Sequence, residues 1–322
     1  MKQISIAFCD FWPGFNTKQN IFIDILNNYY DVNIVKNNPD FLFHSCFGTK
    51  HVMYDCVKIV YLGENLTPDF NLSDYACGFD YIEFDDRYYR LPYYRLQLRK
   101  DDLMSYSAEF FSSESKNKKL FCNFIYSNRN RAHPQREIFF DLLSAYKHVD
   151  SGGGFRNNIG YRVENKREWQ RTYKFSIAFE NSLKTGYTTE KLLDALCAHT
   201  VPIYWGNPEV GRDFNTKRFI NVHEYNSLEE VVNRVRELDN DPAQYLDMLS
   251  EPWFIDEPPL VLKEDPSFVS FLQHIVDQGP EKSRRVVHDG FTRGYIQEKQ
   301  ICYYFRPMLI VGRKIKNVLT RL

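Results

Sequence analysis

Residues 173–205 read YKFSIAFENSLKTGYTTEKLLDALCAHTVPIYW and combine two apolar runs with a helical pattern between them. The first run, FSIAF (175–179), is apolar almost throughout, which is typical of a strand buried on both faces. KLLDALCA (191–198) has the spacing of a covering helix, and VPIYW (201–205) returns as the next strand. The stretch therefore predicts a β-α-β unit of a parallel sheet.

The same alternation of short strands and helices occurs in two series along the chain. The first series begins with QISIAF (3–8) and the second with FCNFIYSN (121–128). Between them, the Ser- and Lys-rich segment SAEFFSSESKNKKL (107–120) has weak periodicity and is the best linker candidate. Two such series predict an α/β protein with two doubly wound domains that face each other across a cleft. The predicted divisions are residues 1–117, residues 118–280 and a helical extension at 281–322.

Composition excludes several classes of protein. The chain has 322 residues, of which 43% are apolar, so it can bury a sizeable core. Its 41 basic and 42 acidic side chains nearly balance, so the chain lacks the excess of positive charge that is typical of proteins with nucleic acid as a partner. The seven cysteines are scattered without a C-x-x-C pair and predict neither a disulfide framework nor a zinc site. We find no signal peptide and no apolar run of membrane-spanning length, so we expect a cytoplasmic protein.

Polar residues gather where the two strands of the 173–205 unit end. ENS (180–182) and GNP (206–208) both fall on the carboxyl edge of the predicted sheet, where ligands bind in such folds. The helix that opens at 188–190 presents free N–H groups, and Lys191 adds a full cation. The cluster predicts a cradle for a nucleotide diphosphate. The alternative is that Thr-Thr-Glu is an ordinary helix cap, although a structural turn does not need so many polar side chains.

The run at 173–210 resembles the signature of the α1,3/α1,4-fucosyltransferase family, whose members carry F-E-N-S, Y-x-T-E-K and V-P-[IV]-x-x-G in this order. Segments 61–94, 151–161 and 219–230 look like the soluble bacterial members that make Lewis-type glycans. The resemblance implies a GT-B type fold with two Rossmann-like domains, GDP-fucose as donor, and inversion at the sugar carbon. It also implies an acceptor that contains galactose-β1,4-GlcNAc, fucosylated at the 3-OH of GlcNAc.

An inverting displacement needs a base that takes the proton of the acceptor hydroxyl. Glu64 directly follows VKIVYLG (57–63) and is therefore expected at a carboxyl edge, whereas Asp80 to Asp86 resemble a solvated turn. Its GEN motif (63–65) also matches the family segment that holds the proposed base. Glu64 is the predicted base, and Asp69 or another acid of this stretch is the alternative.

The departing diphosphate needs fixed cations. Lys191 is one, and Arg136 is predicted as the second because it lies inside the helix that Pro134 opens. The family resemblance falls on Arg136 as well. Arg129 and Arg131 are interpreted as surface charges.

The resemblance supplies the remaining donor contacts. It implies that Glu190 binds the ribose hydroxyls, while Asn181 and Tyr187 line the diphosphate and the fucose. Glu180 either touches the fucose or braces the loop. The D-x-D motif of this half, DND at 239–241, closes a helical pattern and does not follow a strand, so we expect no metal site and no cofactor.

Two other functions remain open at this point. The chain could use another GDP-sugar, such as GDP-mannose, or it could be a binding protein that kept the fold and lost catalysis. Against the second, Glu64, Arg136, Glu190 and Lys191 occur together, which a non-catalytic descendant has no reason to retain.

The C-terminal segment RPMLIVGRKIKNVLTRL (306–322) contains five basic residues and no acidic one, with apolar residues at helical spacing. This pattern predicts a helix that lies on an anionic membrane, as a peripheral contact of a cytoplasmic enzyme that builds a lipid-linked glycan. The alternative is a terminal helix docked on the protein.

Overall fold

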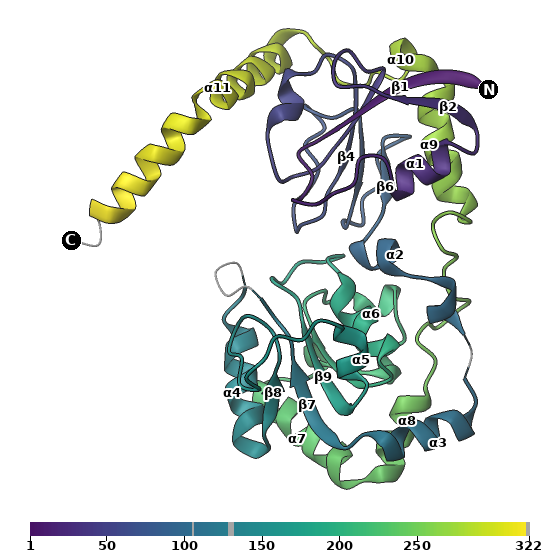
Figure 1. The fold of residues 1–322 in the computed structure, drawn as a ribbon, viewed down its shortest axis with the longest axis vertical. Coiled ribbons are helices and arrows are strands. Elements are labelled where there is room, and N and C mark those ends of the chain that lie inside the picture. Colours follow the sequence, from purple (N-terminus) through teal and green to yellow (C-terminus); the bar gives the residue numbers. More distant parts are fainter. Residues whose placement is uncertain (105, 128–131, 320–322) are drawn as a thin grey trace. The chain divides into compact units, whose positions relative to one another are not determined.

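The chain forms two compact units (Figure 1). The computed structural model describes residues 1–104, 106–127 and 132–319, with side chains beyond Arg306 described only at Met308. The first unit contains residues 1–78 and 82–91 together with the C-terminal part of the chain from residue 262. The second unit contains residues 79–81 and 92–261.

The first unit is built on a six-stranded sheet in which neighbouring strands are parallel. The strand order is β2-β1-β3-β4-β5-β6. The strands are β1 (Lys2–Cys9), β2 (Tyr30–Ile34), β3 (Phe41–His44), β4 (Val57–Tyr61), β5 (Tyr75–Gly78) and β6 (Tyr88–Arg90).

The first unit also contains helices from both ends of the sequence. They are α1 (Ile21–Leu26), η1 (Lys50–Met53), α9 (Pro266–Asp277), α10 (Gly279–Lys282) and α11 (Gly290–Leu319), of which α11 contacts η1. Phe22 of α1 packs against Phe43 of β3 and against Phe268 of α9, with ring centroids 4.8 and 6.3 Å away. Lys2 Nζ also donates to the Val276 carbonyl at 2.7 Å. The C-terminal helices therefore complete the core of the N-terminal sheet.

The second unit has a five-stranded sheet, also parallel throughout, in the order β11-β10-β9-β7-β8. The strands are β7 (Leu120–Phe124), β8 (Val149–Ser151), β9 (Tyr173–Phe179), β10 (Val201–Trp205) and β11 (Ile220–Asn221). The accompanying α-helices are α2 (Tyr93–Gln97), α3 (Ala108–Asn117), α4 (Gln135–Tyr146), α5 (Lys166–Gln170), α6 (Glu190–Cys197), α7 (Leu228–Asn240) and α8 (Pro242–Ser250). Short 3₁₀ turns are η2 (Lys100–Leu103), η3 (Val210–Arg212), η4 (Thr216–Arg218) and η5 (Val222–Glu224).

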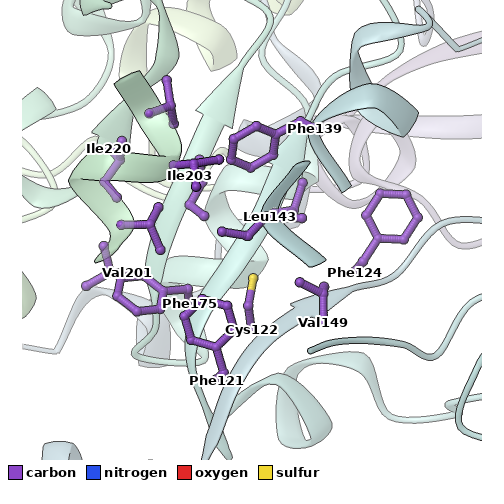
Figure 2. Close-up of a cluster of buried hydrophobic side chains, with 14 of the residues drawn as sticks. Phe121, Cys122, Phe124, Phe139, Leu143, Val149, Phe175, Val201, Ile203 and Ile220 are labelled. Carbon is purple, nitrogen blue, oxygen red and sulfur yellow. The ribbon is translucent and has the colours of Figure 1, made fainter. Parts of the chain in front are cut away.

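Both faces of this second sheet are buried, as its apolar strands predict. Ile177 belongs to a buried cluster with Ile203 of β10. The same cluster contains Phe139 and Leu143 of α4, which lie beside Ile203 in Figure 2. Ala178, the next residue of β9, belongs to the opposite cluster with the leucines of α6. Alternate side chains thus anchor helices on opposite faces, which makes a three-layer α/β unit. The two parallel sheets confirm the predicted α/β class.

The segment predicted as a linker is instead a helix, α3. Ser107 caps it, because the Ser107 hydroxyl accepts from the Phe110 amide at 3.3 Å. Phe111 is buried in the second core, and Glu114 pairs with Arg171 at 2.9 Å. Weak periodicity concealed a helix whose stability comes from tertiary contacts.

The compact units also differ from the predicted divisions at 117 and 280. α2 packs on α6 and α3 packs on α8, so the chain from residue 92 onward belongs with the second sheet. The chain returns to the first unit at residue 262. Among the described helices, α11 included, none is both long enough and apolar enough to cross a bilayer.

Candidate active site

The polar side chains of the second unit meet at the carboxyl edge of its sheet. Glu180 directly follows β9, and Gly206 directly follows the neighbouring β10. Tyr126 lies two residues beyond the end of β7, which pairs with β9 on its other side. Since the three strands are parallel neighbours, their carboxyl ends bring these residues to one edge.

Glu180 and Lys191 form the centre of this edge. Glu180 is fully buried, and its carboxylate accepts from the amide and the hydroxyl of Thr189, both at 2.7 Å. Lys191 Nζ lies 3.2 Å from Glu180 Oε2 and 3.3 Å from Glu190 Oε1. Burial alone would lower the pKa of Lys191, but Glu180 and Glu190 raise it, so the ammonium stays charged.

The start of α6 is organised differently from an ordinary helix cap. Thr189 is the N-cap residue, yet its side chain makes no capping hydrogen bond. Its hydroxyl instead donates to Glu180 and accepts from Lys191 Nζ at 2.9 Å. Glu190, in the first turn, keeps 32% of its side chain exposed. Burial alone would raise the pKa of Glu190, but Lys191 and Lys166 lower it to about 2. The turn thus presents a carboxylate and holds an ammonium in place.

Arg136 approaches the same edge from α4. Its Nη2 donates to the Phe179 carbonyl at 3.0 Å and to Asn181 Oδ1 at 2.8 Å. Its guanidinium carbon lies 4.0 Å from the centroid of the Tyr126 ring. The Arg136 Nε is buried, and neither it nor Nη1 has an acceptor in the described part of the chain.

Tyr126 supports both cations. Its hydroxyl donates to the Ile177 carbonyl at 2.8 Å and accepts from the Phe179 amide at 2.7 Å. Burial raises the pKa of Tyr126 to about 12, and the nearby positive charges of Arg136 and Lys191 oppose that rise. The Arg136 guanidinium thus rests on a buried aromatic ring, and Lys191 belongs to the same sheet edge through its pairing with Glu180.

The loop between β9 and α6 is held by Asn207, which is fully buried. Its Oδ1 accepts from the Gly186 amide at 2.8 Å, and its Nδ2 donates to Thr188 Oγ1 at 3.1 Å. Gly186 has φ +84°, and a Cβ there would lie 2.2 Å from the Phe79 carbonyl oxygen. The following residue, Tyr187, is buried and meets the Phe79 ring edge-on at 4.7 Å.

Glu64 lies in the first unit, three residues beyond the end of β4 and half-buried. The preceding Gly63 allows the Phe47 ring to approach, because a Cβ at Gly63 would lie 3.3 Å from that ring. The alternative base, Asp69, accepts from the Tyr295 hydroxyl at 2.7 Å and from the Asn71 amide at 3.0 Å. Asp69 thus has structural partners in a turn and in α11.

Other acids of the first half also have structural partners. Asp86 pairs with Arg285 and with His274, and Asp80 pairs with Lys184 in the second unit at 2.9 Å. The DND motif is likewise structural. Asp239 accepts from Lys147 and Lys174 at 2.8 Å each, and Asp241 caps α8.

One group of potential metal ligands occurs in the described residues, formed by Asp10, His44 and His51. The two imidazole rings are stacked, with centroids 4.1 Å apart and planes 10° apart. His51 Nδ1 pairs with Asp10 Oδ2 at 2.8 Å, and His44 Nε2 pairs with Ser73 Oγ at 2.9 Å. Lone pairs of parallel stacked rings do not converge on one ion, so this arrangement suits a hydrogen-bonded pair better than a metal centre.

The structure brings together most of the predicted donor residues. Arg136, Glu180, Asn181, Glu190 and Lys191 share the edge described above, and Tyr187 lies in the loop that Asn207 holds. Sequence analysis missed the role of Tyr126, although its position after a strand, like that of Glu180, could have revealed it. Arg129 and Arg131 lie outside the described residues.

Comparison with known proteins identifies the family. Residues 6–97 match the alpha-(1,3)-fucosyltransferase FucT N-terminal domain, and residues 114–253 match glycosyltransferase family 10 (fucosyltransferase), C-terminal part. A solved α1,3-fucosyltransferase with GDP-fucose is 32% identical, with a TM-score of 0.70 over 85% of this chain and 90% of that one. This chain belongs to the fucosyltransferase family.

Two further comparisons define how far this similarity extends. The Helicobacter pylori alpha-(1,3)-fucosyltransferase FucT is 35% identical over 77% of this chain, which spans only 60% of that protein. Anabaena HepE, solved with UDP and glucose, is 9% identical with a TM-score of 0.50, over 85% of this chain and 99% of that one, and shows similarity of fold alone. The protein has a GT-B type fold, as the sequence resemblance predicts.

Proposed function

We propose that this chain is an inverting α1,3-fucosyltransferase. It transfers L-fucose from GDP-β-L-fucose to the 3-OH of GlcNAc in acceptors that contain galactose-β1,4-GlcNAc, which gives Lewis X type products. The family supports fucosyl transfer, and a related structure contains GDP-fucose. The acceptor and the mechanism are proposed from the resemblance and from the chemistry of the residues.

The observation that carries the proposal is that Arg136 and Lys191 lie at the same carboxyl edge, Arg136 bonded to Asn181 and Lys191 paired with Glu180. A buried guanidinium with an unused Nε–H needs an acceptor, and a diphosphate oxygen supplies one. Lys191 remains charged beside Glu180 and Glu190. Both cations are thus in place before reaction to meet the negative charge that grows on departing GDP.

Glu64 is the proposed base. The acceptor 3-oxygen attacks the anomeric carbon of fucose while the bond from that carbon to the diphosphate oxygen breaks. The hydroxyl proton passes to the Glu64 carboxylate, and GDP leaves with the bonding electron pair. One displacement on the opposite face converts the β-linked donor into an α-linked product.

The remaining residues orient the donor. Glu190, partly exposed and ionised, suits hydrogen bonds from the ribose hydroxyls. Asn181 and Tyr187 line the diphosphate and the fucose. Glu180 is fully buried, with its carboxylate occupied by Thr189 and Lys191, which favours the bracing role over direct contact with fucose.

The reaction is proposed to need no metal or cofactor, because Arg136 and Lys191 carry the positive charge that a divalent ion would otherwise supply. We also propose that the protein acts in the cytoplasm and touches the inner membrane surface through residues 306–322. The side chains of that segment lie outside the described residues, except at Arg306 and Met308, so this proposal depends on their sequence pattern.

A transfer assay tests the function. The purified chain is incubated with GDP-fucose, GDP-mannose or a UDP-sugar, with N-acetyllactosamine as acceptor, with and without EDTA. Transfer from GDP-fucose alone, with the linkage defined by NMR, is the expected result, and the activity should survive EDTA. Transfer from GDP-mannose would instead support the other donor, and GDP binding without any transfer would support a non-catalytic protein. Loss of activity in EDTA that Mn²⁺ restores would reveal a missed metal site.

A further inference from the structure

A cavity of about 380 Å³ lies in the first unit, between η1, the start of β4 and the first turns of α11. Lys58, the second residue of β4, lines it, so the cavity is at the amino edge of the sheet. Glu64 follows the opposite end of the same strand, whose five residues extend over about 16 Å. The cavity is therefore distinct from both parts of the candidate active site.

Lys58 is unusual for a lysine because only 4% of the residue is exposed. Its Nζ donates to the Tyr54 carbonyl at 3.0 Å, and among the described residues no carboxylate lies within ion-pair distance of it. An ammonium has three protons to donate, and two of these have no acceptor in the described protein. Burial lowers the pKa of Lys58, and Asp74 opposes that effect from a distance. Such a cation gains from an anion beside it.

The other charged groups around the cavity are mostly basic. His288 and Arg293 line it from the chain that enters α11. Arg293 is 66% exposed, and its nearest carboxylate, Asp289, is 4.0 Å away. The one acidic lining residue, Asp55, is already paired with Arg284 at 2.6 Å.

The face of α11 that borders the cavity carries three regularly spaced polar residues beside the buried Ile296. Arg293, Gln297 and Gln300 recur at intervals of four and three residues and so project from one side of the helix. Gln300 Nε2 donates to the Val52 carbonyl at 2.9 Å, which leaves Arg293 and Gln297 at the more open end. Together with Lys58, this face supplies nitrogen donors from two elements.

We propose that this cavity binds an oxyanion of the phosphate class. Lys58 Nζ donates to it from the sheet, and Arg293 and His288 donate from the side of α11. The group is either free phosphate or a phosphomonoester such as a lipid headgroup, since both present the same oxygens. Because its donors come from β4 and from α11, the bound anion links the helix to the sheet and slows local opening of that contact.

The test uses the full chain at constant ionic strength, with chloride as the reference anion. Inorganic phosphate and glycerol 3-phosphate are titrated separately, and hydrogen–deuterium exchange is followed in peptides that cover 50–58 and 290–300. We expect slower exchange in both peptides for either or both ligands. Tighter binding of glycerol 3-phosphate would identify a headgroup source, and tighter or equal binding of inorganic phosphate would identify free phosphate.

Three variants locate the effect. Lys58→Met removes the ammonium and keeps an apolar side chain of similar length. Arg293→Gln changes a residue whose side chain is 66% exposed, so we expect little effect on folding. Both should weaken binding, at least tenfold for Lys58→Met. Lys263→Gln is the matched control, because this lysine of the same unit is 59% exposed and pairs with Asp24 elsewhere. The proposal would be overturned if neither ligand protected the wild type. It would also be overturned if Lys58→Met and Arg293→Gln were both protected as strongly as the wild type.

Discussion

Arg136 shows how one side chain combines structural and ligand contacts. Two of its N–H groups hold the end of β9 through the Phe179 carbonyl and Asn181, and its face rests on Tyr126. The N–H groups on its other edge can donate to a ligand. A lysine could not do both, because its ammonium is a compact charge without the planar fork of donors. The contacts of Arg136 with Phe179, Asn181 and Tyr126 therefore orient the guanidinium before a ligand binds.

Arg136→Ala and Lys191→Ala should each weaken GDP binding by about tenfold to a hundredfold, the range for charge-assisted hydrogen bonds. The ground-state diphosphate is already charged, so affinity and rate should fall together. Isothermal titration with GDP measures the effect. Arg212→Ala, at an exposed arginine of the same unit, is the control. Unaltered affinity in both variants would move the diphosphate site elsewhere.

Glu64→Gln should lose most of the turnover, about a hundredfold or more for a positioned base, with GDP affinity nearly unchanged. Initial rates of fucosyl transfer and GDP titration give the two quantities. Asp69→Asn is the informative partner, because Asp69 has structural contacts and should keep substantial turnover. The reverse pattern, an active Glu64→Gln and an inactive Asp69→Asn, would make Asp69 the base.

Asp10 should make the first unit sensitive to acid. Burial alone would raise the pKa of Asp10, but the His51 ring and the amides of His51 and Lys50 lower it to about 2. This value lies below the pKa of about 3.9 of an unfolded aspartate, so the stabilisation is present above about pH 4 and is lost as the pH falls toward 2.

Asp10→Asn should therefore cost about 2 kcal/mol at pH 6, since the Asp10 side chain is only 7% exposed and solvent screens its contacts weakly. The difference from wild type should shrink as the pH falls below 4. Urea unfolding across this range measures it, and Asp31→Asn on the exposed surface is the control. A difference that stays constant with pH would contradict the linkage.

At the scale of elements, the loop between β9 and α6 is a braced segment with a fixed path. Asn207, from the end of the next strand, bonds both Gly186 and Thr188, so β10 determines where α6 begins. Glu180 and Lys191 then pair across the loop. The element that presents Lys191 is thus positioned by two strands.

Gly186→Ala should damage this element. A Cβ there meets the Phe79 carbonyl at 2.2 Å, and φ of +84° already disfavours a side chain by about 1–2 kcal/mol. Gly160→Ala is a close control, with φ +82° and no atom near its Cβ. We expect Gly186→Ala to lower the melting temperature more than Gly160→Ala and to weaken GDP binding. Equal effects in the two variants would show that backbone strain alone matters.

At the scale of the whole molecule, the chain begins in one unit, builds the second and returns to complete the first. α9 and α10 belong to the first unit, and α11 contacts η1 and its N-cap residue through Gln300–Val52 and Arg306–Thr49. Tyr295 of α11 also bonds Asp69, in the loop between β4 and β5. These contacts all lie at or before Arg306. A truncation after that residue therefore removes four of the five basic residues of the 306–322 segment and keeps the described docking contacts.

The membrane proposal predicts that the full chain co-sediments with phosphatidylglycerol vesicles and that the form ending at Arg306 stays in solution. Binding should weaken at high salt, because each cation near the surface contributes about 1 kcal/mol of screened attraction. Both forms should melt at the same temperature. Equal pelleting, or unfolding of the truncated form, would show that the segment is structural and that the membrane role is wrong.

The β-α-β unit at 173–205 could be predicted from the sequence because its evidence is local. Apolar runs of strand length, a helical repeat and polar residues at the strand ends are all legible without knowing any contact. Glu180, Arg136 and Lys191 could be singled out for the same reason, since position after a strand or within a first turn assigns them to an edge. The family signature then named the chemistry.

Only the tertiary structure shows which polar side chains hold other parts of the protein in place. Thr189 looks like a cap in sequence, but its hydroxyl serves Glu180, nine residues earlier. α3 looks like a linker because its stability comes from Arg171 and the second core. Residues from 262 onward complete the first sheet although they follow the second. These choices join distant parts of the chain, and local propensity carries no information about contacts made across such separations.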